Sequence, residues 1–210
     1  MKLAGKSLGI AVINKNRWIH ILPMLILGFA LVGCTKGGKK VEQEIAIPAE
    51  ATFSASSADT KMAENQFEKI KSLVGDWYLT GGNQLGKELE PDPEVPFLTY
   101  ATSAAGNCVI EKLFAGQTKE MTTVYFLDNG QLSMHHYCSL GNQPSMVAMP
   151  SAGDEIVFQL LAVGNMSDPN DLHISSHSLK FAGEDKLTAL WGATKEQTAA
   201  SSSVFNVERK

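Results

Sequence analysis

The sequence predicts a mainly β protein: a single antiparallel up-and-down β-barrel of about ten strands with one short N-terminal helix. Three observations lead to this prediction. Apolar and polar residues alternate with period two through almost everything after Gly75, turn residues interrupt the alternation at short intervals, and helical periodicity is confined to the segment before Gly75. Many short antiparallel strands leave a sheet with two open edges, and closure into a barrel removes both.

The first 33 residues are expected to be a secretory signal and not part of the fold. They contain no acidic residue, and their basic residues are followed by thirteen uncharged ones, Ile21–Gly33. This run is shorter than the ~20 apolar residues that a membrane-spanning helix needs, and it is typical of a signal peptide. The basic residues are Lys2, Lys6, Lys15 and Arg17.

The end of this segment, "LVGC", resembles the lipobox of bacterial lipoproteins. The resemblance implies that the chain is cleaved before Cys34, that this cysteine is lipidated, and that the membrane is a partner through the lipid. Thr35 follows in place of an aspartate, which by analogy with enterobacterial sorting favours the outer membrane, facing the periplasm. An ordinary signal peptide or an uncleaved anchor, with an incidental cysteine, remains the alternative.

Removal of the leader would also remove its four basic residues and change the formal net charge from −4 to −8. Such an acidic chain without a basic patch is not expected to bind nucleic acid, because phosphate neutralisation requires clustered Lys and Arg. Residues 34–62 are expected to be the lipidated cysteine and a flexible tether, since Gly, Ser, Ala and Thr dominate them. Residues 63–210 have the length of one domain with its own core.

The domain opens with a helix that Gly75 ends, and the strands follow between turn signals such as "GG", "AGN", "DNG", "GNQP", "SDPND" and "AGED". The apolar positions of the helix are Phe67, Ile70, Leu73 and Val74. The predicted strands are Trp77–Thr80, Leu98–Ser103, Cys108–Ala115, Met121–Leu127, Leu132–Ser139, Met146–Met149, Glu155–Val163, His173–Phe181, Leu187–Thr194 and Ser202–Glu208.

Two motifs resemble known families. "LVGDW", a helix end followed by Gly-x-Trp with Trp77 on the first strand, resembles the opening of lipocalin and calycin barrels, where the tryptophan plugs the closed end. The closing "FNVERK" offers Arg209 as the basic residue that packs against that tryptophan. "EMTTVYFLDNGQLSMHHYCSLGNQPSM" resembles a family of uncharacterised bacterial proteins that is calycin-like and has no established activity, over most of residues 67–198. Nitrobindin-type haem barrels share the architecture, but their Gly-x-Trp-x-Gly signature is absent, so haem binding is an analogy of fold alone.

Alternation assigns side chains to the two faces of each strand. His136 lies on the face that carries Leu132 and Met134, and His177 on the face that carries Leu179, so both histidines are expected to point into the barrel. His135 is expected to point outward. The strand that contains Glu111 has no cleanly polar side, and the pattern leaves the direction of Glu111 open.

Two inward histidines leave three interpretations open. They fill space with their ring nitrogens bonded to the protein, they orient a small molecule in a cavity, or they ligate a metal or haem. The spacing of His173 and His177 does not support metal ligation. Histidines four residues apart come together on a helix, but on a strand these two would lie about 13 Å apart. The candidate ligand-binding residues are His136, Tyr137, Asn142, Gln143, His177 and Trp77.

The function that the sequence favours is a lipid-anchored envelope protein whose barrel binds a small apolar or mixed ligand. An enzyme that uses His136 or Glu111 as acid or base is an alternative, and so is a structural envelope protein with a filled barrel. Cys108 and Cys138 remain after lipidation of Cys34, and an oxidising periplasm makes a disulfide between them possible if their Cα atoms lie within about 7 Å.

Overall fold

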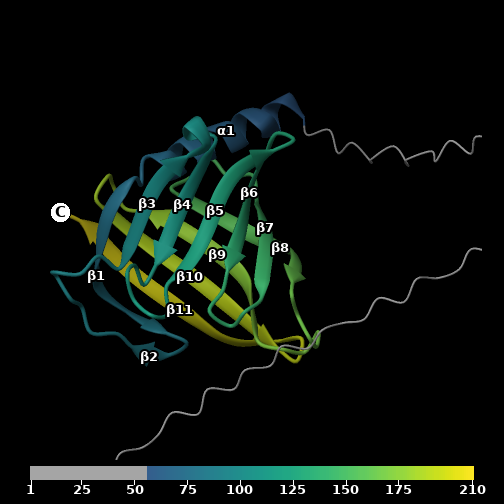
Figure 1. The fold of residues 1–210 in the computed structure, drawn as a ribbon. Coiled ribbons are helices and arrows are strands. Elements are labelled where there is room, and N and C mark those ends of the chain that lie inside the picture. Colours follow the sequence, from purple (N-terminus) through teal and green to yellow (C-terminus); the bar gives the residue numbers. More distant parts are fainter. Residues whose placement is uncertain (1–55) are drawn as a thin grey trace, which may run out of the picture. The chain divides into compact units, whose positions relative to one another are not determined.

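The computed structural model describes residues 56–210, which form a closed antiparallel barrel of ten strands with one further short strand outside it (Figure 1). This confirms the predicted fold class. The strands are β1 (Gly75–Gln84), β2 (Lys87–Glu88), β3 (Leu98–Ser103), β4 (Cys108–Leu113), β5 (Met121–Asp128), β6 (Gln131–Tyr137), β7 (Gln143–Ala148), β8 (Glu155–Gly164), β9 (His173–Phe181), β10 (Lys186–Lys195) and β11 (Thr198–Arg209). The predicted signal segment, Cys34 and residues 35–55 of the predicted tether lie outside the described residues.

The barrel closes because β11 pairs with β1 as well as with β10. Each of the other barrel strands pairs with its neighbours in the chain, and β2 pairs only with β1, so it stands outside the ring. The closing pairs run from Trp77 opposite Arg209 to Asn83 opposite Val204. Gly82 lies in this seam at a φ of +138°, where a Cβ would collide with the backbone of Val204. No strand of the ring is left with an open edge, which is the stable solution for a meander of short strands.

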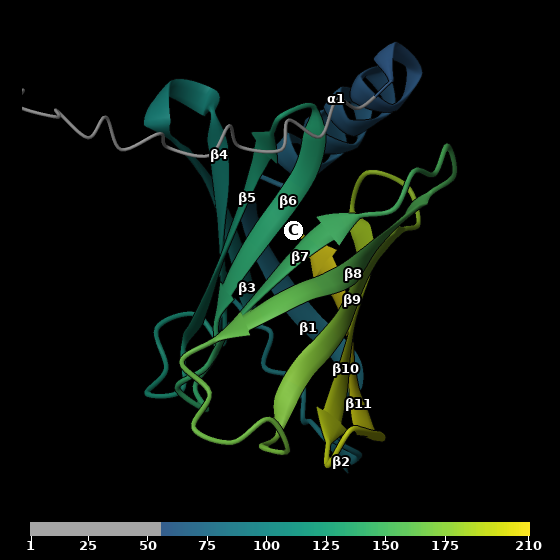
Figure 2. The same ribbon diagram turned by 90° about the vertical axis from the view of Figure 1, so that its right-hand side faces the viewer.

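The α-helix α1 (Ser57–Lys71) lies across the end of the barrel where β5 turns into β6 (Figures 1 and 2). Its inner face buries Ala63, Phe67 and Ile70 against the strands. Ser56 caps it by accepting a hydrogen bond from the Asp59 backbone N–H at 3.2 Å. The helix therefore begins inside the range predicted as tether, because a capping side chain and not apolar periodicity sets its start. No helix of the described residues is long and apolar enough to cross a membrane.

Trp77 plugs the end of the barrel that α1 covers. Its ring is almost fully buried, and its Nε1 donates to the Leu73 carbonyl oxygen at 2.7 Å. The guanidinium of Arg209 lies 4.7 Å from the ring centroid and donates to the Ser72 carbonyl oxygen at 2.7 Å. Both bonds satisfy carbonyls at the end of α1, so the plug also fixes the helix on the barrel. The arrangement is consistent with a calycin-like barrel.

Cys108 and Cys138 are free thiols, which contradicts the possible disulfide. Cys108 begins β4 and lies opposite Phe126 of β5, whereas Cys138 follows Tyr137, which lies opposite Thr122 of β5. Phe126 and Thr122 are four residues apart on one strand, which corresponds to about 13 Å. The two thiols therefore lie toward opposite ends of the barrel, well beyond the roughly 7 Å that a disulfide allows between Cα atoms.

Replacement of the plug should destabilise the barrel. Trp77→Ala leaves a cavity at the closed end, and we expect it to lower the free energy of unfolding by about 3–5 kcal/mol, measured by urea denaturation. Tyr137→Ala is the matched aromatic control, because half of the Tyr137 side chain is exposed, and it should change the value by less than about 1 kcal/mol. Equal losses in the two variants would contradict the assigned role of Trp77.

Candidate functional site

The polar interior of the barrel is built from two cross-strand rows at one level. In the first row Tyr100, Glu111, Thr123 and His136 are direct partners across β3, β4, β5 and β6. In the second row Phe158, His177, Trp191 and Ser203 are direct partners across β8, β9, β10 and β11. Because residues directly opposite each other point to the same face of a sheet, each row is a continuous band on the inner wall. Closure of the barrel makes the two bands face one another.

Glu111 is the centre of the first row, with no exposed surface. Its Oε2 lies 2.6 Å from the Tyr100 hydroxyl and 2.9 Å from the Tyr125 hydroxyl, and its Oε1 lies 3.2 Å from Thr123 Oγ1. Burial raises the pKa of the Glu111 carboxyl, and the three hydrogen bonds oppose that rise only in part. The direction of this side chain, which the sequence left open, is inward.

The two histidines join the rows. His177 Nδ1 donates to the Leu190 carbonyl oxygen at 2.9 Å, and its Nε2 lies 3.0 Å from the Tyr125 hydroxyl. His136 Nδ1 lies 2.9 Å from Thr123 Oγ1. Burial lowers the pKa of His136 to about 4 and the pKa of His177 to about 3, so both rings are neutral at physiological pH. The ring of Trp191 stacks on His177 at 3.7 Å between centroids and contacts His136 at 4.6 Å.

These contacts restrict where the protons can lie. A neutral His177 that donates from Nδ1 has a bare Nε2, so the Tyr125 hydroxyl must donate to it. The Tyr125 oxygen can then bond Glu111 Oε2 only if that oxygen carries a proton. Thr123 donates to the unprotonated Oε1 of Glu111, and His136 Nδ1 in turn donates to Thr123. This is the one arrangement with neutral side chains in which every close contact has a donor and an acceptor.

A charge-separated arrangement with the same number of protons also satisfies every contact. In it Glu111 is a carboxylate, and His177 is an imidazolium that donates to Tyr125. Burial disfavours it, because two charges would have to leave water and the pKa values of both groups move toward their neutral forms. The cluster is therefore best described as a neutral acid and a neutral base joined by a tyrosine hydroxyl.

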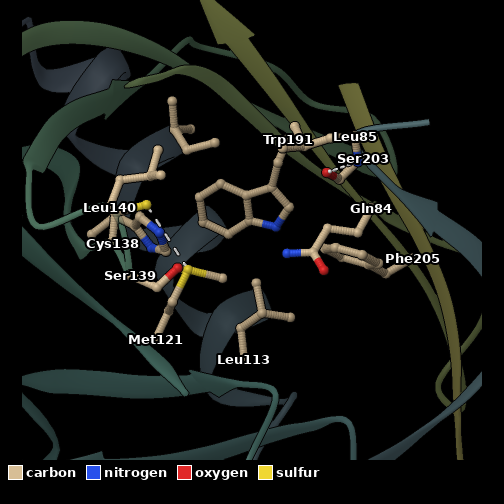
Figure 3. A pocket seen from close by; sticks show the side chains of 12 residues that line it. Gln84, Leu85, Leu113, Met121, Cys138, Ser139, Leu140, Trp191, Ser203 and Phe205 are labelled. Atoms are coloured by element: carbon tan, nitrogen blue, oxygen red, sulfur yellow. Dashed lines mark hydrogen bonds between the residues drawn. The ribbon is translucent and has the colours of Figure 1, made fainter. Parts of the chain in front are cut away.

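A pocket of about 80 Å³ lies beside this cluster, at the end of the barrel away from α1 (Figure 3). Its wall is mostly apolar, and the loop that follows β6 contributes to it. Trp191 Nε1 is buried and has no hydrogen-bond partner within residues 56–210. Figure 3 shows this nitrogen on the side of the pocket where the Gln84 carboxamide lies. The lining residues are Gln84, Leu85, Leu113, Met121, His136, Cys138, Ser139, Leu140, Ile174, Trp191, Ser203 and Phe205.

The structure separates the candidate residues that the sequence grouped together. His136 lines the pocket, and His177 lies behind Trp191, inside the hydrogen-bond network. Tyr137 is half exposed on the outer face of β6. Trp77 lies at the opposite, plugged end of the barrel.

The loop residues of the "GNQP" motif also lie outside the pocket lining. Asn142 is buried and donates from Nδ2 to the Leu172 carbonyl oxygen at 2.9 Å, which ties this loop to the one before β9. Gln143 is exposed at the start of β7. The motif therefore positions its neighbours Cys138, Ser139 and Leu140, which do line the pocket.

Sequence reasoning missed Tyr100, Thr123, Tyr125 and Trp191 as site residues. Each occupies an apolar or neutral position in an alternating strand, where an aromatic or threonine is ordinary. The available signal was Glu111 between the apolar Val109 and Leu113, because an inward carboxyl must have partners. Identifying those partners required the register between strands.

The two inward histidines do not suit joint ligation of haem or a metal ion. Both ring nitrogens of His177 are engaged, so this histidine has no lone pair for a metal without loss of its bonds to Tyr125 and Leu190. Residues 56–210 contain no group of three or more His, Cys, Asp or Glu side chains placed to hold an ion. A pocket of about 80 Å³ is also far smaller than sites for drug-sized ligands, which occupy about 300–1,000 Å³.

The protonation of Glu111 predicts a pH-dependent effect of Glu111→Gln. The pKa of Glu111 is higher in the folded protein than in the unfolded chain, where it is near 4.5. The contribution of Glu111 to wild-type stability is therefore complete below pH 4.5 and is lost as the pH rises toward the folded-state pKa. Glutamine does not titrate, so the stability of the variant does not fall in this way. The free energy of unfolding of the variant, relative to the wild type, should therefore rise by about 1 kcal/mol per pH unit over this window. Urea denaturation of both proteins from pH 4.5 to 8 measures the difference, and a difference independent of pH would mean that Glu111 is ionised in the fold.

No protein-family model matches this chain, and no curated protein matches it. The functional assignment therefore depends on the chain's own geometry. Its most informative features are the buried neutral cluster and the indole N–H of Trp191, which has no partner in the part of the chain that the structure describes.

Proposed function

We propose that the barrel is a small-molecule-binding module whose ligand enters the pocket at the end away from α1. The observation that carries the proposal is Trp191: its side chain lines the pocket, and its indole N–H is buried and unpartnered within the described residues. Buried polar groups almost always have a partner, so an unpaired donor beside a cavity indicates that a ligand or water supplies the acceptor. The apolar wall with a few polar groups is typical of ligand sites.

The size of the pocket limits the part of the ligand that it can enclose. A cavity of 150 Å³ in another protein accommodates benzene, and this pocket has about half that volume. Only a few non-hydrogen atoms therefore fit inside in this conformation, and the rest of a larger ligand extends through the mouth. Leu85 and Leu140 offer apolar contact there, because both line the pocket and remain partly exposed.

An enzyme remains the second candidate function, because one imidazole reaches the pocket. His136 is linked through Thr123, Glu111 and Tyr125 to His177. A proton taken up at His136 can therefore be passed along this chain, each group giving up its own proton, to the unprotonated Nε2 of His177. Glu111 itself is fully buried and does not line the pocket, and it cannot contact a substrate directly. Turnover that His136→Ala abolishes, with the fold retained, would favour this function over binding alone.

We propose further that the protein is held in the cell envelope by a lipid on Cys34. The support comes from the order of basic leader, apolar run and "LVGC" in the sequence. A bacterial lipoprotein carries several acyl chains, and each buried CH₂ contributes about 0.8 kcal/mol, so such an anchor is stable.

Cys34→Ala tests the anchor. We expect the wild type, but not this variant, to incorporate a clickable palmitate analogue in a bacterial host. Cys108→Ala and Cys138→Ala are the matched controls and should label like the wild type. Labelling of Cys34→Ala at the wild-type level would contradict lipidation at this residue.

The binding function is tested by closing the mouth of the pocket. We expect small apolar carbonyl and hydroxyl compounds to shift the indole N–H signal of Trp191 in NMR spectra of the full-length protein. Leu140→Trp should weaken that binding at least tenfold, because the enlarged side chain covers the pocket. Leu161→Trp is the matched control, since Leu161 is exposed on β8 and does not line the pocket. A panel that leaves the Trp191 signal unmoved, or equal binding to both variants, would overturn the proposal.

A further inference from the structure

We propose that the pocket selects uncharged ligands whose polar end has a carbonyl oxygen and an N–H or O–H donor on the same carbon, as in a primary carboxamide. This inference rests on the proposed binding function and specifies the ligand class. It follows from the hydrogen-bonding direction of three polar groups in the pocket wall, those of His136, Trp191 and Gln84.

His136 presents an acceptor. Its Nδ1 donates to Thr123, because Thr123 uses its own proton on Glu111 Oε1. The neutral ring therefore carries no proton on Nε2, which can act only as an acceptor. A ligand that contacts His136 at this nitrogen must supply an N–H or O–H.

Trp191 and Gln84 present donors. An indole nitrogen can only donate, and that of Trp191 is unpartnered within the described residues. The ammonium of Lys119 donates to Gln84 Oε1 at 3.1 Å, which leaves the amide N–H₂ of Gln84 as the group free to meet a ligand. Figure 3 shows the Trp191 nitrogen and the Gln84 carboxamide on one side of the pocket. A ligand oxygen is the natural partner for both.

The donor and acceptor walls are close enough for one small group to contact both. The rings of His136 and Trp191 lie 4.6 Å apart between centroids and line the same pocket. A carboxamide places its oxygen and nitrogen on one carbon, so it can accept from the indole side while it donates to the imidazole side. A ketone satisfies only the donors, and an amine satisfies only His136.

The charge of the wall favours a neutral ligand. His136 is held neutral by burial, and a carboxylate would place a desolvated charge against its bare nitrogen without a proton to share. The ammonium of Lys119 bonds Gln84 and lies 3.7 Å from the Phe114 ring centroid, but Lys119 does not line this pocket. Lys119 therefore orients the side-chain amide of Gln84 and does not place a positive charge inside the pocket.

Three probes of similar size separate these requirements: butyramide, 2-pentanone and sodium butyrate. Each is titrated into the full-length protein at pH 7, and the indole N–H signal of Trp191, assigned with Trp191→Phe, is followed by NMR. We expect butyramide to bind about tenfold more tightly than 2-pentanone, the value typical of one hydrogen bond whose partner would otherwise be unpaired in a buried site. We expect butyrate to bind more weakly than the amide.

Two variants assign the preference to its source. His136→Phe removes the acceptor and should abolish the advantage of butyramide over 2-pentanone. Gln84→Met removes a donor at a partly exposed position and should weaken both carbonyl compounds several-fold, which keeps the test valid if the buried variant fails to fold. Tyr137→Phe, on the outer face, is the control and should match the wild type.

The outcomes distinguish this inference from the function on which it rests. If 2-pentanone or butyrate binds as tightly as butyramide while shifting the Trp191 signal, the ligand class is wrong and the binding function stands. The ligand class is also wrong if none of the three probes shifts the Trp191 signal but other compounds of the small-molecule panel do. If no compound of either set moves the Trp191 signal, the binding function itself is overturned.

Discussion

The structure depends on one constraint: Glu111 is a carboxyl group with no access to water. An isolated carboxylate in such a place would cost many kcal/mol, so the group must be neutral or fully compensated. Tyr100, Tyr125 and Thr123 surround it with hydroxyls, and His177 accepts a hydrogen bond from Tyr125. The same burial keeps the pKa of both histidines low, so the cluster stays neutral as a unit.

The need to bury Glu111 with its partners allows only one register between the strands. Glu111 alternates with Lys112, so a slip of one residue in β4 would turn the carboxyl outward and bring an ammonium into the core. The partners of Glu111 lie on β3 and β5, and the network ends at His177 on β9, across the barrel. A polar interior of this kind therefore specifies both the pairing of neighbours and the closure that brings distant strands together.

The hydrogen-bond network around Glu111 also connects the end of the barrel that is filled by side chains to the end that holds the pocket. On the α1 side the interior is filled around Trp77, and at the other end the wall of the pocket includes His136 and Trp191. Thr123 donates to Glu111 Oε1 and must accept from His136, so the buried carboxyl fixes which nitrogen of the pocket imidazole carries a proton. A residue that no ligand can touch thereby sets the hydrogen-bonding character of the surface that a ligand would meet.

The sequence by itself determined the β-barrel class, all ten barrel strands to within a few residues, and the inward direction of His136 and His177, because these follow from local alternation and turn chemistry. It did not determine the start of α1, the short strand β2 or the direction of Glu111, where the local pattern is weak or ambiguous. Only the tertiary structure decided which residues form the site. Trp77 and Tyr137 were grouped with His136 as candidate ligand-binding residues, yet the structure places Trp77 at the plugged end and Tyr137 on the outer face. Partners such as Tyr125 and His177 are 52 residues apart, and no local pattern records a contact over that separation.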